Sequence, residues 1–255
     1  MSMTIISDIH IKENNDEAYK LLIKFLKHKK TIEAKEIFLL GDIFEFMCGQ
    51  RSEYYKKFSE YFDSVVHMIK NGKKIYYIEG NHDFHLKNLY ENYFKLNNIS
   101  NDDISNFKVY SKSIVLERSG KKYMFAHGDN IFFGGLFYPM YKKIILSFPV
   151  KKIMEVIPED TFDTLGDVAS SFSKSVRKKK NIDYSIIRDK FRKKIAKLAY
   201  KKKYDVIVLG HVHVQDNCII TIKNFESHYL NNGYALETYS FIHIADDGGI
   251  EFARL

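Results

Sequence analysis

Residues 75–83 read Ile-Tyr-Tyr-Ile-Glu-Gly-Asn-His-Asp: four large apolar side chains, then an abrupt change to glycine and polar residues. The same arrangement, a short apolar run that ends in Gly, Asp, Asn or His, occurs five times. The runs are residues 4–7, 37–40, 75–78, 123–126 and 206–209. Continuous apolar runs of this length are typical of strands buried on both faces. We therefore expect five buried strands.

The segments between the first predicted strands have the periodicity of helices. Apolar residues recur at i, i+3, i+4 and i+7 within residues 18–26 and 54–69, which predicts two amphipathic helices, the first capped by Asp16. Alternating strands and helices indicate an α/β fold. Further strands are predicted at residues 109–117, 218–222, 239–245 and 250–252, the last two joined by an Asp-Asp-Gly-Gly turn. The fold should therefore mix parallel and antiparallel pairing.

Residues 130–203 interrupt this rhythm. All three prolines, Pro139, Pro149 and Pro158, fall within this stretch, where proline ends or kinks helices. Short helices are expected there, followed by longer ones around residues 161–179 and 184–203. Because a single core usually stops growing near 250–300 residues, we expect one domain over residues 1–255, with a helical lid inserted at about 130–203.

The composition is that of an ordinary globular protein. The 255 residues include 45% hydrophobic residues and carry a net charge of +8, which excludes disordered, collagen-like and disulfide-stapled chains. Cys48 and Cys218 fit free thiols in a reducing compartment. The absence of an apolar leader or an apolar stretch of about 18 residues predicts a cytoplasmic protein. A pI of about 9.1 favours a polyanionic partner, namely a phosphorylated substrate, nucleic acid or an anionic membrane.

Polar residues follow the predicted strands where each one ends. In α/β sheets, ligands bind beyond the carboxyl ends of the strands, so five such ends indicate one site. The set offers carboxylate, amide and imidazole groups: Asp8, His10, Asp42, Asn81, His127, His211 and His213. Such N/O donors suit Mn, Fe or Zn. Seven ligands exceed the needs of one ion, whereas two ions sharing Asp42, about 3.5–4 Å apart, would use them all and could hold a nucleophile and a phosphoryl oxygen.

The spacing of these residues supports convergence. Asp8 and His10 are two residues apart, as are His211 and His213, so each pair would point to one side if the chain stays extended there. A glycine, Gly41, Gly80 or Gly210, directly precedes three of the candidate ligands. We expect each glycine to allow a tight exit from its strand.

These motifs resemble a known family. D-x-H, G-D, G-N-H-D, H-G-D and G-H-x-H, in this order from Asp8 to His213, are similar to the signature of the calcineurin-like metallophosphoesterases. The resemblance implies an α/β sandwich of two mixed β-sheets flanked by helices. It also implies a metal-dependent hydrolase of phosphoester or phosphoanhydride bonds with two divalent ions, Mn²⁺ expected and Fe or Zn as alternatives. The first ion would be held by Asp8, His10, Asp42 and His213, and the second by Asp42, Asn81, His127 and His211.

The same resemblance implies roles for three neighbouring residues. His82 would protonate the leaving oxygen, Asp83 would orient His82, and Asn81 would help the metals to stabilise the developing charge. An imidazole near its ordinary pKa suits proton transfer at neutral pH.

Within that superfamily, further stretches are similar to the UDP-2,3-diacylglucosamine pyrophosphatases of lipid A assembly. They are Gly-Asp-Ile-Phe-Glu at 41–45, Asn-His-Asp-Phe at 81–84, the insertion, and Tyr-Leu-Asn-Asn-Gly at 229–233. The best-known members carry arginine in place of His82, and others carry histidine. The leading substrate hypothesis is a nucleotide-diphospho-lipid, with peripheral contact at the inner face of the membrane.

Two other functions remain open. A nuclease or other phosphodiesterase or phosphatase of the superfamily is favoured by the charge of +8. A non-catalytic interaction scaffold is the third reading, against which the complete ligand set argues. Metal analysis would separate a scaffold from an enzyme.

Several polar and aromatic residues have weaker patterns. Glu45 and Asp129 are more typical of groups that orient ligands or cap helices. Five histidines without a pattern are expected at the surface or in the core: His28, His67, His85, His228 and His243. The aromatic residues Phe132, Phe133, Phe137 and Tyr141 form either an acyl-chain groove or the inside of the insertion. The lysine clusters at 177–180 and 201–203 are a solvated helix face or a contact with anionic lipid.

Overall fold

The computed structural model describes residues 2–132, 147, 149, 152, 157 and 184–255. Its first sheet has six strands in the order β13-β12-β1-β2-β4-β6. Strands β1, β2, β4 and β6 are parallel, and β12 pairs antiparallel with β1 and β13. The strands are β1 (Met3–Ile6), β2 (Glu36–Leu39), β4 (Lys74–Ile78), β6 (Phe107–Tyr110), β12 (Ser240–Ile244) and β13 (Ile250–Arg254).

The second sheet has five strands in the order β10-β11-β9-β8-β7. Its three middle strands are parallel, with an antiparallel partner at each edge. The strands are β7 (Ile114–Arg118), β8 (Lys121–Ala126), β9 (Val206–Leu209), β10 (Asp216–Ile222) and β11 (Phe225–Asn231). A small two-stranded sheet joins β3 (Met47–Cys48) to β5 (Asp83–Phe84). The predicted α/β sandwich of two mixed sheets is confirmed.

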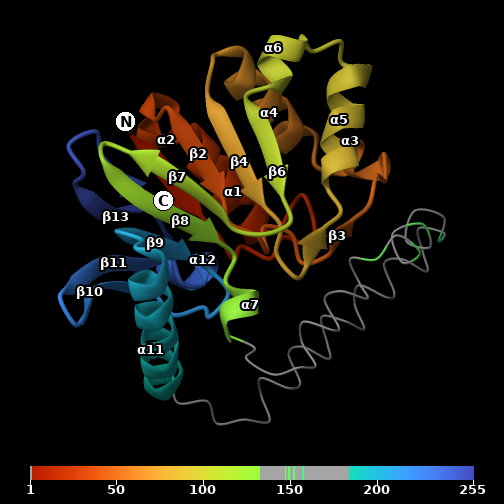
Figure 1. Ribbon diagram of the computed structural model, residues 1–255. Helices are drawn as coiled ribbons and strands as arrows, with labels where there is room; N and C mark the ends of the chain where they lie inside the picture. Colours follow the sequence, from red (N-terminus) through yellow and green to blue (C-terminus); the bar gives the residue numbers. More distant parts are fainter. Residues whose placement is uncertain (1, 133–146, 148, 150–151, 153–156, 158–183) are drawn as a thin grey trace.

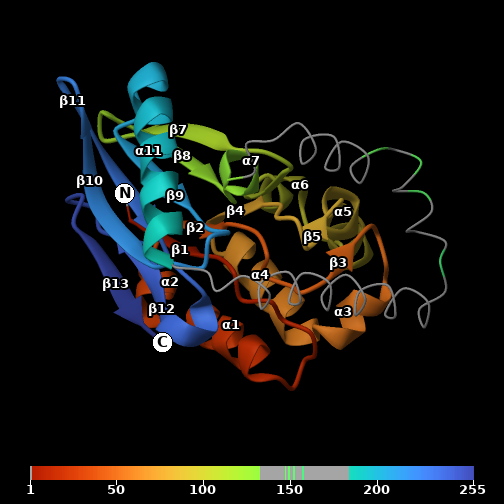
Figure 2. The ribbon, with the colours of Figure 1, turned by 90° about the horizontal axis from the view of Figure 1, so that it is seen from below.

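Helices cover the outer faces of both large sheets (Figures 1 and 2). The helices are α1 (Glu17–Lys27), α2 (Lys29–Glu33), α3 (Glu53–Lys57), α4 (Ser59–Lys70), α5 (Lys87–Leu96), α6 (Asn101–Ile104), α7 (Asp129–Phe132), α11 (Tyr184–Lys202) and α12 (Ala235–Thr238). Helices α1, α4 and α5 pack on the six-stranded sheet, and α11 packs on the five-stranded sheet. Among the described residues, no helix has the length and apolar character needed to cross a membrane.

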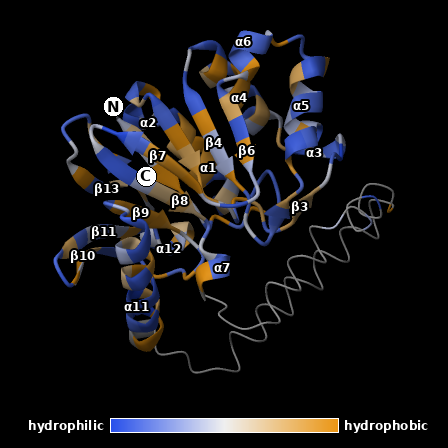
Figure 3. Ribbon diagram, viewed as in Figure 1, coloured by the Kyte–Doolittle hydropathy of each residue, from blue (hydrophilic) through white to orange (hydrophobic). Residues whose placement is uncertain are grey.

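The five apolar runs are strands β1, β2, β4, β8 and β9, as predicted, and each is buried on two faces. In β2, Phe38 faces the core between the sheets, whereas Ile37 and Leu39 face the helices. Phe38 stacks on Phe125 of β8, with ring centroids 4.0 Å apart, so the two sheets meet through aromatic rings. Figure 3 shows the hydrophobic colour on these central strands, with the helices largely hydrophilic on their outer faces. Burial on both faces explains why the runs are continuous rather than alternating.

Tertiary packing divides two predicted elements. The strand expected at 109–117 is two strands in different sheets, because the chain leaves the first sheet after Tyr110 and joins the second at Ile114. The helix expected at 54–69 breaks at Phe58, whose φ of −120° and ψ of 39° are not helical. Phe58 is buried between Phe44 and Tyr19, with centroid distances of 4.8 and 5.6 Å. A periodicity calculation does not detect such a break because both halves keep the same buried face.

Helix α1 begins as predicted, since Oδ1 of Asp16 accepts a hydrogen bond of 2.6 Å from the backbone N–H of Tyr19. Strand β11 was not predicted; it forms a hairpin with β10 around residues 223–224. The helix expected at 184–203 is α11, which buries Phe191, Ile195 and Ala199 on the second sheet. This end of the predicted lid is therefore an outer layer of the sandwich.

Other predictions for the lid lie outside the described residues. These are the helices predicted at 130–183, apart from α7, and the aromatic residues Phe133, Phe137 and Tyr141.

Candidate metal centre

The carboxyl ends of strands from both sheets meet at one place. The sequence predicted that all five strands end at one edge of a single open sheet. In the structure, β1, β2 and β4 belong to the first sheet, and β8 and β9 belong to the second. Nδ1 of His127, after β8, lies 2.9 Å from the carbonyl oxygen of Leu40, after β2. The backbone N–H of His211, after β9, donates to the carboxylate of Asp8 at 3.0 Å. The candidate ligands therefore converge at the junction of the two sheets.

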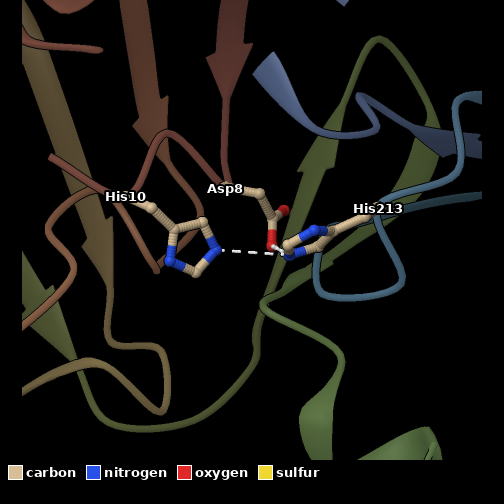
Figure 4. A group of neighbouring side chains, drawn as sticks. All are labelled: Asp8, His10 and His213. Carbon is tan, nitrogen blue, oxygen red and sulfur yellow. Dashed lines mark hydrogen bonds and ion pairs between the residues drawn. The ribbon is translucent and has the colours of Figure 1, made fainter. Parts of the chain in front are cut away.

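One group of side chains consists of Asp8, His10 and His213 (Figure 4). Nε2 of His213 lies 3.3 Å from Oδ1 of Asp8 and 3.2 Å from Nε2 of His10. One ligand atom from each residue lies within 4.8 Å of the others, a spacing that could hold a metal ion. Asp8 is fully buried, so its charge is not screened by solvent.

A second group consists of Asp42, His127 and His211. Nε2 of His127 lies 3.3 Å from Oδ2 of Asp42 and 3.2 Å from Nδ1 of His211. Oδ1 of Asn81 is also 3.2 Å from Nε2 of His127. All seven residues predicted as ligands thus lie in the two groups or in contact with them.

The carboxylate of Asp42 lies between the two groups. Its Oδ1 accepts hydrogen bonds of 2.9 and 3.0 Å from the backbone N–H groups of Asn81 and His82. Its Oδ2 faces His127 at 3.3 Å and His10 at 3.9 Å, and it is buried without a hydrogen-bond partner among the described residues. A buried carboxylate oxygen without a donor is unfavourable unless a cation compensates it. The donor set therefore fits a pair of cations with Asp42 between them.

The electrostatics keep the carboxylates ionised. Burial raises the pKa of Asp8, but the hydrogen bond and the charge of His213 outweigh it and bring the pKa to about 2. For Asp42, burial again acts upward, and the charges of His127 and His82 hold the pKa well below its ordinary value. Both groups remain anionic at neutral pH, the form that binds metal.

The two histidines of the second group, His127 and His211, differ in pKa. Burial and the charge of His127 lower the pKa of His211 to about 3, so His211 is neutral. Burial lowers the pKa of His127 as well, but the charge of Asp42, whose Oδ2 lies 3.3 Å from Nε2 of His127, raises it to about 10. His127 must therefore lose a proton before its Nε2 can act as a ligand.

The backbone of the ligand loops is left-handed, which corrects the expectation of an extended chain. Positive φ values of 53°, 59°, 51°, 71° and 57° occur at Asp8, His10, Asp42, His211 and His213. Such values are uncommon for residues other than glycine and recur at functional sites. The pairs converge because the chain turns sharply after each strand, and strand alternation plays no part.

The three glycines that precede candidate ligands lie where these loops contact one another. A Cβ atom on Gly41 would lie 2.7 Å from Cα of Gly80, and one on Gly80 would collide with Asp42 and Asp83. A Cβ on Gly210 would collide with Ser7 and Asp8. Each glycine is therefore needed for the close approach of neighbouring loops.

His82 lies beside the first group, but Asp83 does not orient it as predicted. Nδ1 of His82 lies 2.8 Å from the backbone oxygen of Glu45, and its ring is edge-on to that of His10. Asp83 is fully buried and accepts from backbone N–H groups of Asp42 and Ile43. It also accepts from the N–H of Gly80 and the hydroxyl of Tyr77 at 2.8 and 2.6 Å. Because these donors occupy its carboxylate, Asp83 joins two ligand loops, and Glu45 holds His82.

Burial and the charge of Asp42 raise the pKa of Asp83 to about 6. Asp129, predicted to orient a ligand, is buried at the start of α7, and its charge helps to raise the pKa of His127. None of the patternless histidines, His28, His67, His85, His228 or His243, belongs to a metal-binding group of the described residues.

Sequence reasoning missed Tyr234. Its ring stacks on His213, with centroids 5.2 Å apart and planes at 11°, and lies 6.0 Å from the ring of His10. The adjoining N–H of Ala235 donates to the backbone oxygen of Asp8 at 3.1 Å. No motif marks Tyr234, and its position directly after the 229–233 stretch is the only signal in the sequence.

Comparisons with known proteins identify a family for this chain. Residues 1–215 match the sequence model of the calcineurin-like phosphoesterases. UDP-2,3-diacylglucosamine hydrolase of Wigglesworthia glossinidia brevipalpis is 25% identical over 214 residues, covering 84% of this chain and 80% of the relative. The protein of that name from Neisseria meningitidis serogroup A is 27% identical over 157 residues, 60% of this chain and 59% of the relative. A solved archaeal phosphodiesterase is similar with a TM-score of 0.49 and 12% identity, covering 100% of both chains.

Proposed function

The chain belongs to the calcineurin-like phosphoesterase family and is a metal-dependent hydrolase of phosphoester bonds, and from this premise we propose that the two groups of side chains hold two divalent ions. The first ion is assigned to Asp8, His10, Asp42 and His213, and the second to Asp42, Asn81, His127 and His211. The observation that carries this assignment is Oδ2 of Asp42, buried between the two groups with no hydrogen-bond donor in the part of the chain that the structure describes. We assign Mn²⁺ as the ion, with Fe and Zn as the alternatives that the same N/O donors suit.

Two bound divalent ions supply activation of water and neutralisation of charge on a phosphoryl group. The protein supplies position and protons. The amide of Asn81 is held at the edge of the second group and is proposed to help stabilise the charge that develops on the phosphoryl oxygens.

His82 is the proposed acid for the leaving oxygen. The carbonyl of Glu45 can only accept, so Nδ1 of His82 carries a proton, and the proton given to the leaving oxygen would come from Nε2. His82 is 9% exposed, which limits proton exchange with bulk water. Asp83 acts at a distance by holding the loops that carry Asp42 and Gly80.

The proposed substrate is UDP-2,3-diacylglucosamine or a similar nucleotide-diphospho-lipid. Support comes from the names of the curated relatives, 22–27% identical to this chain. We further propose that residues 1–255 form one domain, and that part of the 130–203 segment is a lid over acyl chains beside an anionic membrane surface. Each acyl CH₂ buried there would contribute about 0.8 kcal/mol to substrate binding.

A screen of hydrolysis with Mn²⁺ tests the substrate. It compares nucleotide-diphospho-lipids, cyclic nucleotides, phosphomonoesters and nucleic acid. We expect kcat/KM for UDP-2,3-diacylglucosamine to exceed that for its deacylated form at least about tenfold, which corresponds to burial of roughly two CH₂ groups. A preference for the deacylated compound would remove the lipid assignment and leave the metal assignment intact.

A nuclease or phosphodiesterase activity on nucleic acid is the second candidate. The solvent-exposed side of α11 carries Lys190, Lys193, Lys194, Lys197 and Lys201, and the net charge is +8. If these lysines bind phosphates, the affinity for DNA or RNA falls steeply with salt because counterions are released. Flat salt dependence together with absent cleavage excludes this candidate.

A further inference from the structure

Glu45 lies directly beside the candidate metal centre, four residues after Gly41. It is 8% exposed, and its backbone N–H donates to the carbonyl of Ile11 at 2.8 Å. The N–H of Ile11 in turn donates to the carbonyl of Ile43 at 2.9 Å. The segment that carries Glu45 is thus bonded to the segment that carries His10.

The side chain of Glu45 contacts His10 at the ring nitrogen that does not face Asp42 and His213. Glu45, His10 and His82 also form a third group, whose ligand atoms lie within 4.8 Å of one another. Oε2 lies 2.9 Å from Nδ1 of His10. That nitrogen is buried and makes no aligned hydrogen bond among the described residues, so the Glu45 carboxylate is its neighbour by distance. The other ring nitrogen, Nε2, faces His213 at 3.2 Å and Asp42 at 3.9 Å. A carboxylate beside Nδ1 favours the proton there and leaves the lone pair of Nε2 directed at the metal groups.

The backbone of the same residue holds a second imidazole. The carbonyl oxygen of Glu45 accepts from Nδ1 of His82 at 2.8 Å. The rings of His10 and His82 are 4.9 Å apart between centroids and nearly perpendicular, at 84°. One residue therefore contacts a candidate ligand through its side chain and the candidate acid through its main chain.

We propose that Glu45 is a positioning residue that presents Nε2 of His10 to the first ion, while its carbonyl sets the ring of His82. The proposal rests on the assignment of His10 as a ligand of the first ion. The two contacts use different parts of Glu45, so a substitution of the side chain separates them. Groups that hold a metal-binding histidine in this way usually change metal affinity about 10–100-fold when removed.

Titration of the metal-free protein with Mn²⁺, followed by calorimetry, tests the proposal without substrate. Glu45→Met keeps the volume of the side chain and removes the carboxylate. We expect one of two binding events to weaken about 10–100-fold and the other to stay unchanged. Glu45→Gln keeps an acceptor oxygen and should recover part of the loss. Glu53→Met is the matched control: it removes the same charge from a carboxylate that pairs with Arg51 at 3.3 Å, and it should leave both events unchanged.

The tautomers of the histidine rings provide a second readout in the metal-free protein. Nitrogen NMR should find the neutral His10 ring with its proton on Nδ1 in the parent protein. In Glu45→Met it should find a mixture of the two neutral tautomers, with the proton on Nδ1 in some molecules and on Nε2 in others. His82 should keep its proton on Nδ1 in both, because its acceptor is a backbone carbonyl.

Three results would overturn the proposal: unchanged binding in Glu45→Met, equal weakening of both events, or an unchanged His10 tautomer. A parent protein that does not bind two ions would instead contradict the dinuclear assignment itself. If Glu45→Met fails to fold, Glu45→Gln carries the test, since loss of the charge alone should weaken one event severalfold.

Discussion

The two oxygens of the Asp42 carboxylate have different surroundings. Oδ1 is satisfied by two backbone N–H groups, whereas Oδ2 has no donor within residues 2–132 and 184–255 or the other described residues and faces a histidine on either side. The backbone bonds fix the rotation of the carboxylate, so Oδ2 is held between the groups before any ion binds. In the proposed dinuclear site, this single side chain would link the two groups.

Replacing Asp42 with alanine should remove activity and two-ion loading together, because the substitution deletes the ligand proposed to be common to both ions. Metal analysis of the purified variant, with activity measured in parallel, checks this. Asp63→Ala on α4 is a suitable control, since its carboxylate bonds to the hydroxyl of Tyr93 and not to the site. Two ions retained in Asp42→Ala would contradict the bridging assignment.

His82→Ala should keep both metals and lose about 10²–10⁴-fold in turnover, the range that general acid catalysis usually supplies. The reason is that His82 is the proposed acid for the leaving group and is not counted among the seven proposed ligands. The loss should shrink for a substrate whose leaving group needs no proton, such as 4-nitrophenolate. If metal content falls along with turnover, His82 is a ligand and its assigned role is wrong.

At the scale of elements, the loops after the strands hold residues in conformations that the chain avoids elsewhere. Asp8, His10 and Asp42 have left-handed backbones, each of which costs about 1–3 kcal/mol. Asp83 offsets part of this cost, since it accepts hydrogen bonds from the loop that starts at Gly41 and from Gly80. The ligand loops are thus held by their neighbours and not by their own preferences.

A partly buried ion pair joins the edge of the second sheet to the first. Glu36 of β2 is fully buried and accepts from Nε and Nη2 of Arg118 of β7 at 3.0 and 2.8 Å. The hydroxyl of Tyr76 of β4 also donates to Glu36 at 3.1 Å. Burial and the nearby charge of Glu36 raise the pKa of Tyr76 to about 12, so the hydroxyl keeps its proton and remains a donor.

Arg118→Met should lower the free energy of unfolding by about 3 kcal/mol, because Glu36 would remain charged and buried without its cation. We place the effect at the low end of the usual range since the side chain of Arg118 is 22% exposed and water can reach the vacated position. Urea denaturation measures it. The double variant Glu36→Gln/Arg118→Met should recover most of the loss; a single variant as stable as the parent would show that the ion pair contributes nothing.

At the scale of the whole molecule, the candidate metal centre joins the two halves of the sandwich. Asp8, His10, Asp42 and Asn81 follow strands of the first sheet, and His127, His211 and His213 follow strands of the second. Ions bound there would link both sheets at one end, whereas Phe38 and Phe125 link them inside the core.

Removing the metals should therefore lower the melting temperature. An ion present at about 1,000 times its Kd stabilises the fold by about 4 kcal/mol, which corresponds to a shift of roughly 8–16 °C for a chain of this size. Thermal unfolding with and without a chelator, followed by restoration with Mn²⁺, measures the shift. Asp42→Ala should show little response to the chelator, and an equal response in both proteins would place the stabilising ion elsewhere.

The sequence alone determined the buried strands and the chemistry of the site. Five short apolar runs predicted strands covered on both faces, because a half-exposed strand would alternate. The polar residues that follow these runs include all seven candidate ligands, since ligands in such folds bind at the carboxyl ends of the strands. Both signals are local, so they can be read without knowledge of the packing.

The tertiary structure alone decided how these pieces are combined. Which strands share a sheet depends on pairing between residues that are distant in the sequence. The sequence near each run therefore does not indicate which of the two sheets the run joins. The break between Tyr110 and Ile114 follows from that division. The left-handed ligand loops and the contact of Glu45 with His10 and His82 also depend on neighbours far along the chain. Local preference would extend these loops, and only the hydrogen bonds and close packing of the assembled strand ends hold them turned toward one another.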